Sequence, residues 1–338
     1  MVKKSSLVAI IAFCLIILVN PIDAVTSEMA PFASVNQSPL VSIFGLPGAG
    51  NFLLMEPGKT ELGLNAVLSS NYTKNNNARE SIIIDGETTR FTLTARRGLA
   101  PRFEVGVKLP YIVQGGGFLD SAIESYHSAF GFPQGGRDLA PRNRLFYNYR
   151  RDGVDRLRID NSGSGVGDLA LTGAWQFYQS GGSEKEGLAL NVSLKLPTGD
   201  SDQLLGSGST DIALWLTGGS EAKFEFGKWT TYGAAGMLYL TEGKVLAVQQ
   251  KNWAGFGTLG LGWQTPLAWL ALKVQADAHT PFYRDSELKE MGANSVQLIA
   301  GGTIYLSGKT SLDIGVGEDL VVNSAPDVSF YLTLRNRF

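Results

Sequence analysis

The final eleven residues of the 338-residue chain alternate between apolar and polar side chains and end in an aromatic residue. Successive side chains of a β-strand point to opposite faces, so this pattern predicts a terminal strand with one apolar face. Such a strand has to cover its free edge, and closing onto the first strand of a barrel does this; within a bilayer closure is obligatory. We expect barrel closure, and sorting by the barrel-assembly machinery, to depend on the apolar residues Phe330, Leu332, Leu334 and Phe338.

Eleven further segments show the same alternation between turn signals, which gives an even total of twelve, as in bacterial outer-membrane barrels. The fold class predicted is therefore all-β, a transmembrane antiparallel up-and-down β-barrel of about twelve strands. The predicted strands span residues 60–73, 79–98, 102–115, 165–178, 187–198, 208–225, 228–241, 250–266, 268–280, 292–306, 310–321 and 326–338.

The predicted connections alternate between long polar loops and short turns, an asymmetry typical of outer-membrane barrels, whose tight turns face the periplasm. Four tryptophans lie near the short turns and predict an interfacial girdle of amphipathic rings. They are Trp175, Trp229, Trp263 and Trp269.

The polar face of several strands is too polar for a packed soluble core, whereas the apolar face is too long and regular for a surface in water. A lipid-facing outside and a hydrated lumen explain both. A soluble sandwich also shows alternation, but its strands are usually shorter, about five to six residues. The barrel is therefore the favoured interpretation.

The start of the chain predicts a cleaved export signal. Lys3 and Lys4 precede an apolar run from Leu7 to Val19, and Ala24 is the expected cleavage point. The run is too short to span a bilayer as a helix, which takes about twenty residues. We therefore expect domains of 1–24 (signal peptide), 25–58 (N-terminal extension or plug) and 59–338 (barrel), in the outer membrane of a Gram-negative bacterium.

Composition excludes few functions. The net charge of −2 gives no basic excess for nucleic acid, and the one cysteine, Cys14, lies inside the predicted signal. No spacing of metal ligands is evident. We expect no cofactor, no metal and no nucleic-acid partner, and contacts instead with outer-membrane lipid and lipopolysaccharide and with a small solute of unknown identity.

Three segments resemble those of outer-membrane transporter barrels related to the MetA-type family of phenol degradation: 165–169, 194–200 and 206–211. With 84–87, 117–127 and 130–133, the chain is still more similar to a proteobacterial outer-membrane β-barrel family of unknown function. The resemblance implies a barrel in the outer membrane and, from the transporter family, passage of small hydrophobic solutes. It implies no particular substrate.

The connection 116–164 is the strongest functional candidate, because loops of this length usually carry function or disorder. It contains seven arginines and no lysine. It could fold into the lumen, with guanidinium groups that bind carboxylates or phosphates; equally, it could be a solvated outer loop whose arginines pair with its own acids or with lipopolysaccharide. The constriction candidates are Arg137, Arg142, Arg144, Arg150 and Arg151.

Charged residues with inward parity have two interpretations. They could line a selective path for a polar solute, or form cross-strand ion pairs that fill and stiffen the barrel, and the second is favoured for any single residue. The lumen candidates are Glu104, Lys108, Asp168, Lys195, Asp211, Lys273 and Asp277.

Residues 25–58 lack strong periodicity but contain Ile43, Phe44 and Phe52, which favour burial. The segment could enter the lumen as a plug or lie across the periplasmic turns. Function is accordingly predicted as a channel or facilitator for small solutes, with hydrophobic solutes as one candidate class, and not as catalysis. The alternatives are a lipid-modifying barrel enzyme, with His279 or His127 as base, and a plugged structural or adhesive barrel.

Overall fold

A computed structural model describes residues 28–131, 136–181, 184–320 and 325–338. The predicted signal peptide therefore lies outside the described residues. The elements are β1 (Thr60–Asn76), β2 (Glu80–Ala100), β3 (Phe103–Gly115), α2 (Asp120–Phe130), a short 3-10 helix (Arg137–Leu139), β4 (Phe146–Arg151), β5 (Val154–Ile159), β6 (Gly163–Val166), β7 (Leu169–Gln179), β8 (Glu186–Leu196), β9 (Asp211–Phe224), β10 (Gly227–Leu240), β11 (Trp253–Gln264), β12 (Leu270–His279), α3 (Lys289–Gly292), β13 (Ser295–Tyr305), β14 (Thr310–Asp319) and β15 (Val328–Arg337).

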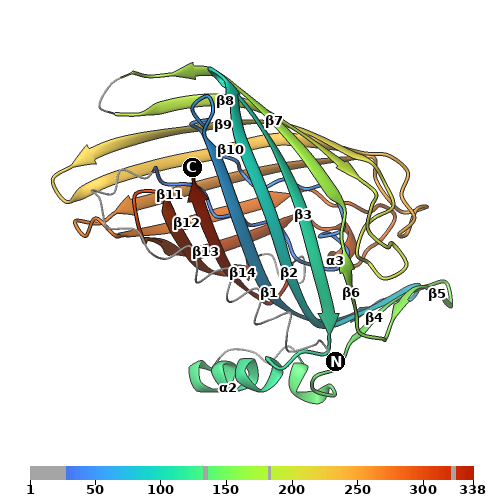
Figure 1. Cartoon of the computed structure of the whole chain (residues 1–338). Helices are drawn as coiled ribbons and strands as arrows, with labels where there is room; N and C mark the ends of the chain where they lie inside the picture. Colours follow the sequence, from blue (N-terminus) through green and yellow to red (C-terminus); the bar gives the residue numbers. More distant parts are fainter. Residues whose placement is uncertain (1–27, 132–135, 182–183, 321–324) are drawn as a thin grey trace.

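The strands form a closed antiparallel barrel of twelve strands, in which β6 and β7 together make one interrupted strand (Figure 1). Closure is between β1 and β15, in continuous register from Glu61 opposite Arg337 to Ser70 opposite Val328. The predicted fold class and the closing role of the terminal strand are thus confirmed. Among the described residues, no helix is both long and apolar enough to cross a membrane.

The strand predicted at 165–178 is not continuous in the structure, where it is divided into β6 and β7. Pro110 in β3 has no N–H to donate, and opposite it the chain breaks at Gly167 and Asp168, where Gly167 N donates to Pro110 O at 2.8 Å. The break separates β6 from β7. It places Asp168 at the inner wall, where the side chain is buried.

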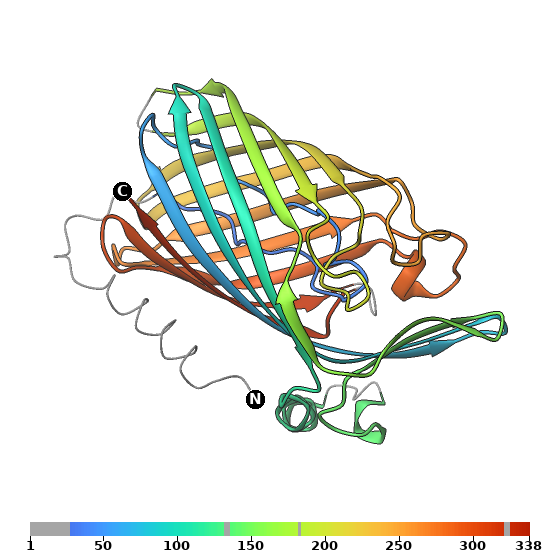
Figure 2. The same cartoon turned by 45° about the vertical axis from the view of Figure 1, so that its right-hand side comes forward.

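The connection 116–164 is more ordered than the alternating pattern predicted, because β4 and β5 form a hairpin inside it. The start of β2 extends beyond the barrel, and β4 pairs with this extension from Glu80 opposite Arg151 to Asp85 opposite Phe146. Figure 2 shows the hairpin projecting from one end of the barrel. Its strands are only six residues long and contain two arginines each, so they were interpreted as part of a polar loop.

Long connections gather at one end of the barrel and short turns at the other, as predicted. Both ends of the barrel sheet, Thr60 and Phe338, lie at the short-turn end, joined by two backbone hydrogen bonds. Aromatic residues mark that end: Trp229 stacks on Trp263 with ring centroids 5.8 Å apart. Large apolar side chains are exposed on the outer face between the ends, including Leu93, Leu171, Val192, Leu214, Leu259, Val274, Ile314, Phe330 and Leu332.

The segment 28–58 runs through the interior of the barrel (Figure 2). Its side chains are buried at Phe32, Leu40, Ile43 and Phe52, each exposing at most 3 % of its surface. We call residues 28–58 the inner segment. The inner segment leads into β1 at the short-turn end of the barrel. There Gly58 N donates to Gly98 O at 2.8 Å.

Candidate functional site: the lumen and its inner segment

The first limb of the inner segment runs parallel to β12 and in step with it. Phe32 N donates to Gln275 Oε1 at 2.9 Å, and Lys273 Nζ donates to Ala30 O at 2.9 Å. Five contacts join residues 243 positions apart: Ala30 with Lys273, Phe32 with Gln275, Ser34 with Asp277, Asn36 with His279 and Leu40 with Tyr283. A constant separation means that this limb has one fixed register against the wall.

The second limb runs parallel to β9, again in a single register. Gly45 N donates to Asp211 Oδ2 at 2.7 Å, and Trp215 Nε1 donates to Ala49 O at 2.8 Å. These contacts, and one from Thr217, join residues 166 positions apart. Since β9 and β12 are antiparallel through β10 and β11, the inner segment is a hairpin spread across the inside of the wall.

The turn between the limbs lies in an apolar cluster at the long-loop end. Val41 N and Ser42 N both donate to Ser38 O, which closes the turn. Phe44 stacks on Phe282 with centroids 4.9 Å apart and nearly parallel planes. The cluster joins the turn to the β2 extension, β4 and the long connections, through Leu40, Val41, Ile82, Ile84, Tyr147, Tyr149, Leu204, Val245, Leu288 and Met291.

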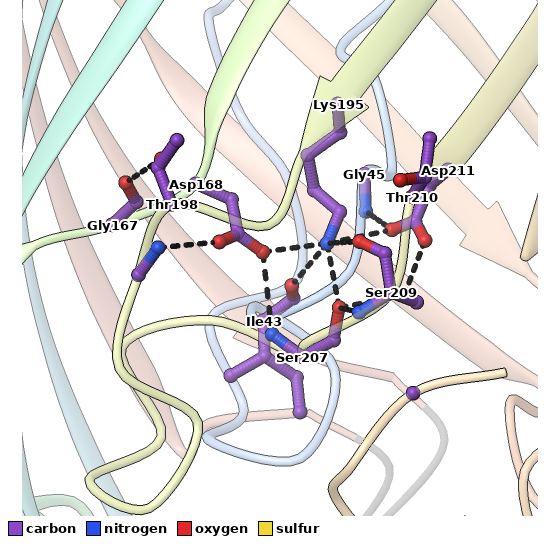
Figure 3. A network of polar contacts seen from close by, with 12 residues as sticks. Ile43, Gly45, Gly167, Asp168, Lys195, Thr198, Ser207, Ser209, Thr210 and Asp211 are labelled. Carbon is purple, nitrogen blue, oxygen red and sulfur yellow. Dashed lines mark hydrogen bonds and ion pairs between the residues drawn. The ribbon is translucent and has the colours of Figure 1, made fainter. Parts of the chain in front are cut away.

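A buried charge network connects the inner segment to β7, β8 and β9 (Figure 3). Lys195 Nζ lies 2.5 Å from Asp168 Oδ2 and 3.1 Å from Asp211 Oδ2, and these side chains expose 5 % or less of their surface. Lys195 also donates to Ser207 Oγ at 2.5 Å and to Ile43 O at 3.4 Å. A buried ammonium is tolerable only when paired and hydrogen-bonded in this way.

The three motifs behind the predicted resemblance converge on this network. Asp168 comes from 165–169, Lys195 from 194–200 and Asp211 from 206–211. The glycines of the motifs make room: a Cβ on Gly206 would clash with the Asp168 carboxylate, and Gly199 N donates to Asp168 Oδ1 at 2.8 Å. Sequence reasoning found the charges and the motifs but had no means of joining them.

A second network lies nearer the short-turn end. Lys273 Nζ is 3.1 Å from Asp313 Oδ1 and 4.1 Å from the centroid of the Phe32 ring. Arg335 pairs with the other oxygen of Asp313 and donates to Pro31 O at 3.2 Å. Two cations thus share one carboxylate and use spare donors to bind backbone carbonyls of the inner segment.

Glu104 and Asp277, also lumen candidates, bind the inner segment. Glu104 Oε2 accepts from Met55 N at 3.0 Å while its other oxygen pairs with Arg96 at 3.0 Å. Asp277 accepts hydrogen bonds from Ser34 and from Thr258. The structure therefore places both acids at the wall of the lumen, against the inner segment.

Uncharged inward side chains complete the attachment, and sequence reasoning did not single these out. Gln176 accepts from Leu54 N at 3.0 Å and donates to Phe52 O at 2.7 Å. Asn65 Nδ2 donates to Ala33 O at 3.0 Å. Their inward parity was the available signal, but polarity without charge did not distinguish them from lumen-lining residues.

A cavity of about 160 Å³ separates the inner segment from the opposite wall. Arg90 Nη2 donates to Ser42 O at 2.8 Å across it, whereas Arg90 Nε is buried without a hydrogen-bond partner in the part of the chain that the structure describes. Lys108 also lines the cavity. The lining includes Gln37, Phe44, Leu46, Pro47, Asn65, Thr92, Pro110, Asp168, Ser193 and Lys195.

The arginine candidates of 116–164 lie beside acidic residues, an arrangement that agrees with the second interpretation of this loop, in which its arginines pair with acids. Arg142 and Arg150 have side chains 60 % and 55 % exposed, and they pair with Glu124 and Asp155. Arg144 pairs with Asp85, and Arg151 lies 3.8 Å from Glu80. The β2 extension carries the loop outward, so the loop's arginines meet acidic residues there.

Arg137 is the one buried member of that set. It pairs with Asp120 at the start of α2 and with Asp327, and donates to Ser70 Oγ at 3.1 Å. Burial alone would lower the pKa of Arg137, but the carboxylates of Asp327 and Asp120 outweigh burial and raise it. Arg137 thus fixes the connection 116–164 to the end of the barrel.

His279, the base of the enzyme alternative, is buried against the inner segment. Its Nε2 accepts from Asn36 Nδ2 at 2.8 Å, and its Nδ1 donates to Thr280 O at 2.9 Å. Both ring nitrogens are therefore engaged inside the barrel, away from lipid. The side chain of His127 lies outside the described residues.

A family model described as "Protein of unknown function (DUF3187)" matches residues 7–338. The chain belongs to the DUF3187 family. The predicted resemblance to an outer-membrane barrel family of unknown function is thereby confirmed. Among curated proteins, no relative matches the chain.

Two solved structures of channels are similar to the chain to different degrees. The COG4313 outer membrane channel from Pseudomonas putida F1 is similar at a TM-score of 0.52 and 13 % identity, covering 86 % of the DUF3187 chain and 98 % of its own. The CymD monoaromatic hydrocarbon channel gives a TM-score of 0.35 at 10 % identity, covering 91 % and 98 %. The first similarity shows a shared fold, and the second is too low to argue from. The DUF3187 protein thus has the fold of an outer-membrane β-barrel.

Proposed function

We propose that the DUF3187 protein is a channel for small solutes in which the inner segment is the gate. The observation that carries this proposal is the attachment of the inner segment. Wall side chains bind its backbone in two fixed registers, at sequence separations of 243 and 166. A segment held by many separate hydrogen bonds can leave stepwise, because each bond contributes only about 0.5–1.5 kcal/mol net.

The inside of the wall supports a conducting state. When the inner segment leaves, the side chains that bind it face the lumen: Gln275, Asp277, Lys273, Asp211 and Gln176. A wall of polar and charged groups is stable in water, and such a lumen is usual in outer-membrane channels. A barrel filled only for stiffness would need no such hydrated face.

The lumen at the long-loop end has an apolar lining that suits hydrophobic solutes. There the lumen is filled by the apolar cluster around Phe44, Phe282 and Tyr283. A solute with an apolar body could replace the contacts that the turn of the inner segment makes. The similar Pseudomonas structure is described as an outer membrane channel, which supports the proposal of a channel but gives no class of solute.

Conductance tests the proposal. Mature protein is refolded into planar bilayers beside a variant that lacks residues 28–51, and vesicle uptake of neutral aromatic and sugar solutes is measured in parallel. We expect rare brief openings from the intact chain and sustained conductance from the deletion variant. A deletion variant that folds, by heat-modifiable gel mobility, and neither conducts nor admits solutes would favour the plugged structural barrel.

A further inference from the structure

The cavity beside the inner segment contains more positive than negative charge. Arg90 and Lys108 reach it from β2 and β3, and neither forms an ion pair within the described residues. The neighbouring network holds one cation, Lys195, between two carboxylates, Asp168 and Asp211. Three cations against two anions leave a net charge of +1.

Two buried polar atoms of residues that line the cavity lack protein partners. Arg90 Nε is a buried donor without an acceptor, and Gln37 Oε1 is a buried acceptor without a donor, among the residues described. Gln37 exposes only 2 % of its surface. Leaving such groups unsatisfied is costly, about 1–3 kcal/mol each, so a ligand that satisfies them would gain this energy.

Part of the remaining lining is apolar. Phe44, Leu46 and Pro47 of the inner segment face Pro110 of β3 across the space. An inorganic anion would match the charge but leave this surface without contacts. A molecule with one anionic group and an apolar body would match both.

We propose that this cavity binds a small monocarboxylate with an apolar body, with the carboxylate between Arg90 and Lys108. Guanidinium suits this group because its N–H donors match a planar carboxylate. A net charge of +1 favours a monoanion over a dianion. The inference deepens the proposed function by naming a solute class, but binding at the cavity is measured without transport.

The experiment is calorimetric titration of the refolded full mature chain in detergent with benzoate, and with benzamide as a neutral molecule of the same shape. We expect benzoate to bind at least about tenfold more tightly than benzamide, as loss of a charge-assisted contact predicts. Arg90→Gln and Lys108→Met should each weaken benzoate binding by about tenfold or more, and Arg90→Lys should retain part of it. Lys309→Met is the matched control, since Lys309 lies in the exposed turn before β14 and should change nothing.

Equal binding of benzoate and benzamide, or unchanged benzoate binding in both variants, would overturn the proposal. Tight binding of inorganic phosphate with no gain for benzoate would also overturn it, in favour of a simple anion site. Heat-modifiable gel mobility verifies that each variant is folded. If one of the two cation variants does not fold, the other still tests the site. Benzoate binding without conductance would support this site and contradict the proposed channel. Conductance without benzoate binding would support the channel and contradict this site.

Discussion

The backbone N–H of Phe32 donates to Oε1 of Gln275 at 2.9 Å, and Gln275 also accepts from the hydroxyl of Tyr232 at 3.1 Å. One side chain thereby joins the inner segment to β12 and to β10. Contacts on either side, at Ala30 and Ser34, repeat the same sequence separation. The register of the first limb therefore depends on a short row of inward side chains, and Gln275 is central to it.

Replacing Gln275 with leucine should loosen the first limb. The change leaves Phe32 N buried without its acceptor, at a cost of about 1–3 kcal/mol. We expect amide hydrogen exchange in residues 28–40 to accelerate by roughly tenfold or more, and open probability in bilayers to rise. Gln264→Leu is the control, because Gln264 bonds only to the turn around Leu270. Equal exchange rates in the two variants would show that Gln275 does not hold the inner segment in place.

Lys195→Met should be strongly destabilising. It leaves the carboxylates of Asp168 and Asp211 buried without their shared cation, and breaking a buried pair costs about 3–5 kcal/mol. The midpoint of urea unfolding, followed by tryptophan fluorescence in detergent, should fall accordingly. Lys228→Met removes a partly exposed pair with Glu221 and should cost about 1 kcal/mol or less. Similar losses in the two variants would contradict this prediction.

Arg137→Gln should release the connection 116–164 without altering the pore. Asp120 and Asp327 lose their common partner, so protease cleavage between residues 116 and 164 should become faster. Ion selectivity should stay constant, because this arginine lies outside the lumen. Arg142→Gln is the exposed control for cleavage. A changed selectivity in either variant would revive the constriction hypothesis.

Deleting Phe338 should impair assembly more than stability. Its side chain is 60 % exposed on the outer face, whereas its backbone N–H bonds to Thr60 O at 2.8 Å. We propose that the assembly machinery recognises this terminal aromatic residue, together with Phe330, Leu332 and Leu334. Less heat-modifiable protein in cells, with normal refolding in detergent, is the expected result; Phe338→Tyr should behave as the intact chain. Normal assembly of the deletion variant would contradict the sorting role.

The barrel was predictable because alternation repeats in every strand and a bilayer leaves few other folds for it. In the terminal strand, Arg335 and Arg337 pair with Asp313 and Glu61. The β4–β5 hairpin was not predictable. It is stabilised by its position on the β2 extension, where Tyr147 and Tyr149, with Leu157 and Ile159 opposite them, pack against the apolar cluster.

The lumen was predictable only as a list of inward charges. The pairing of Lys195 with Asp168 depends on the interruption between β6 and β7 at Gly167. It also depends on the loop that places Ser207 beside both side chains. The role of backbone carbonyls such as Ala30 O and Ile43 O is invisible in sequence, because every residue has one. The contacts between the inner segment and the wall join residues far apart in the sequence, so only the folded structure shows them.

A reversible cross-link between the inner segment and the wall tests the gate most directly. The mature chain has no cysteine if the predicted signal is removed, and a Cβ on Gly45 would lie 3.0 Å from Asp211 Cβ, so a small shift gives disulfide spacing. Ser69→Cys with Ser329→Cys, whose hydroxyls are 2.8 Å apart across the β1–β15 seam, is the wall control, and Asp211→Cys alone accounts for the lost charge. We predict that Gly45→Cys with Asp211→Cys is closed when oxidised and conducts after reduction, while both controls are insensitive to reductant. Equal conductance of the oxidised and reduced double variant would contradict the account.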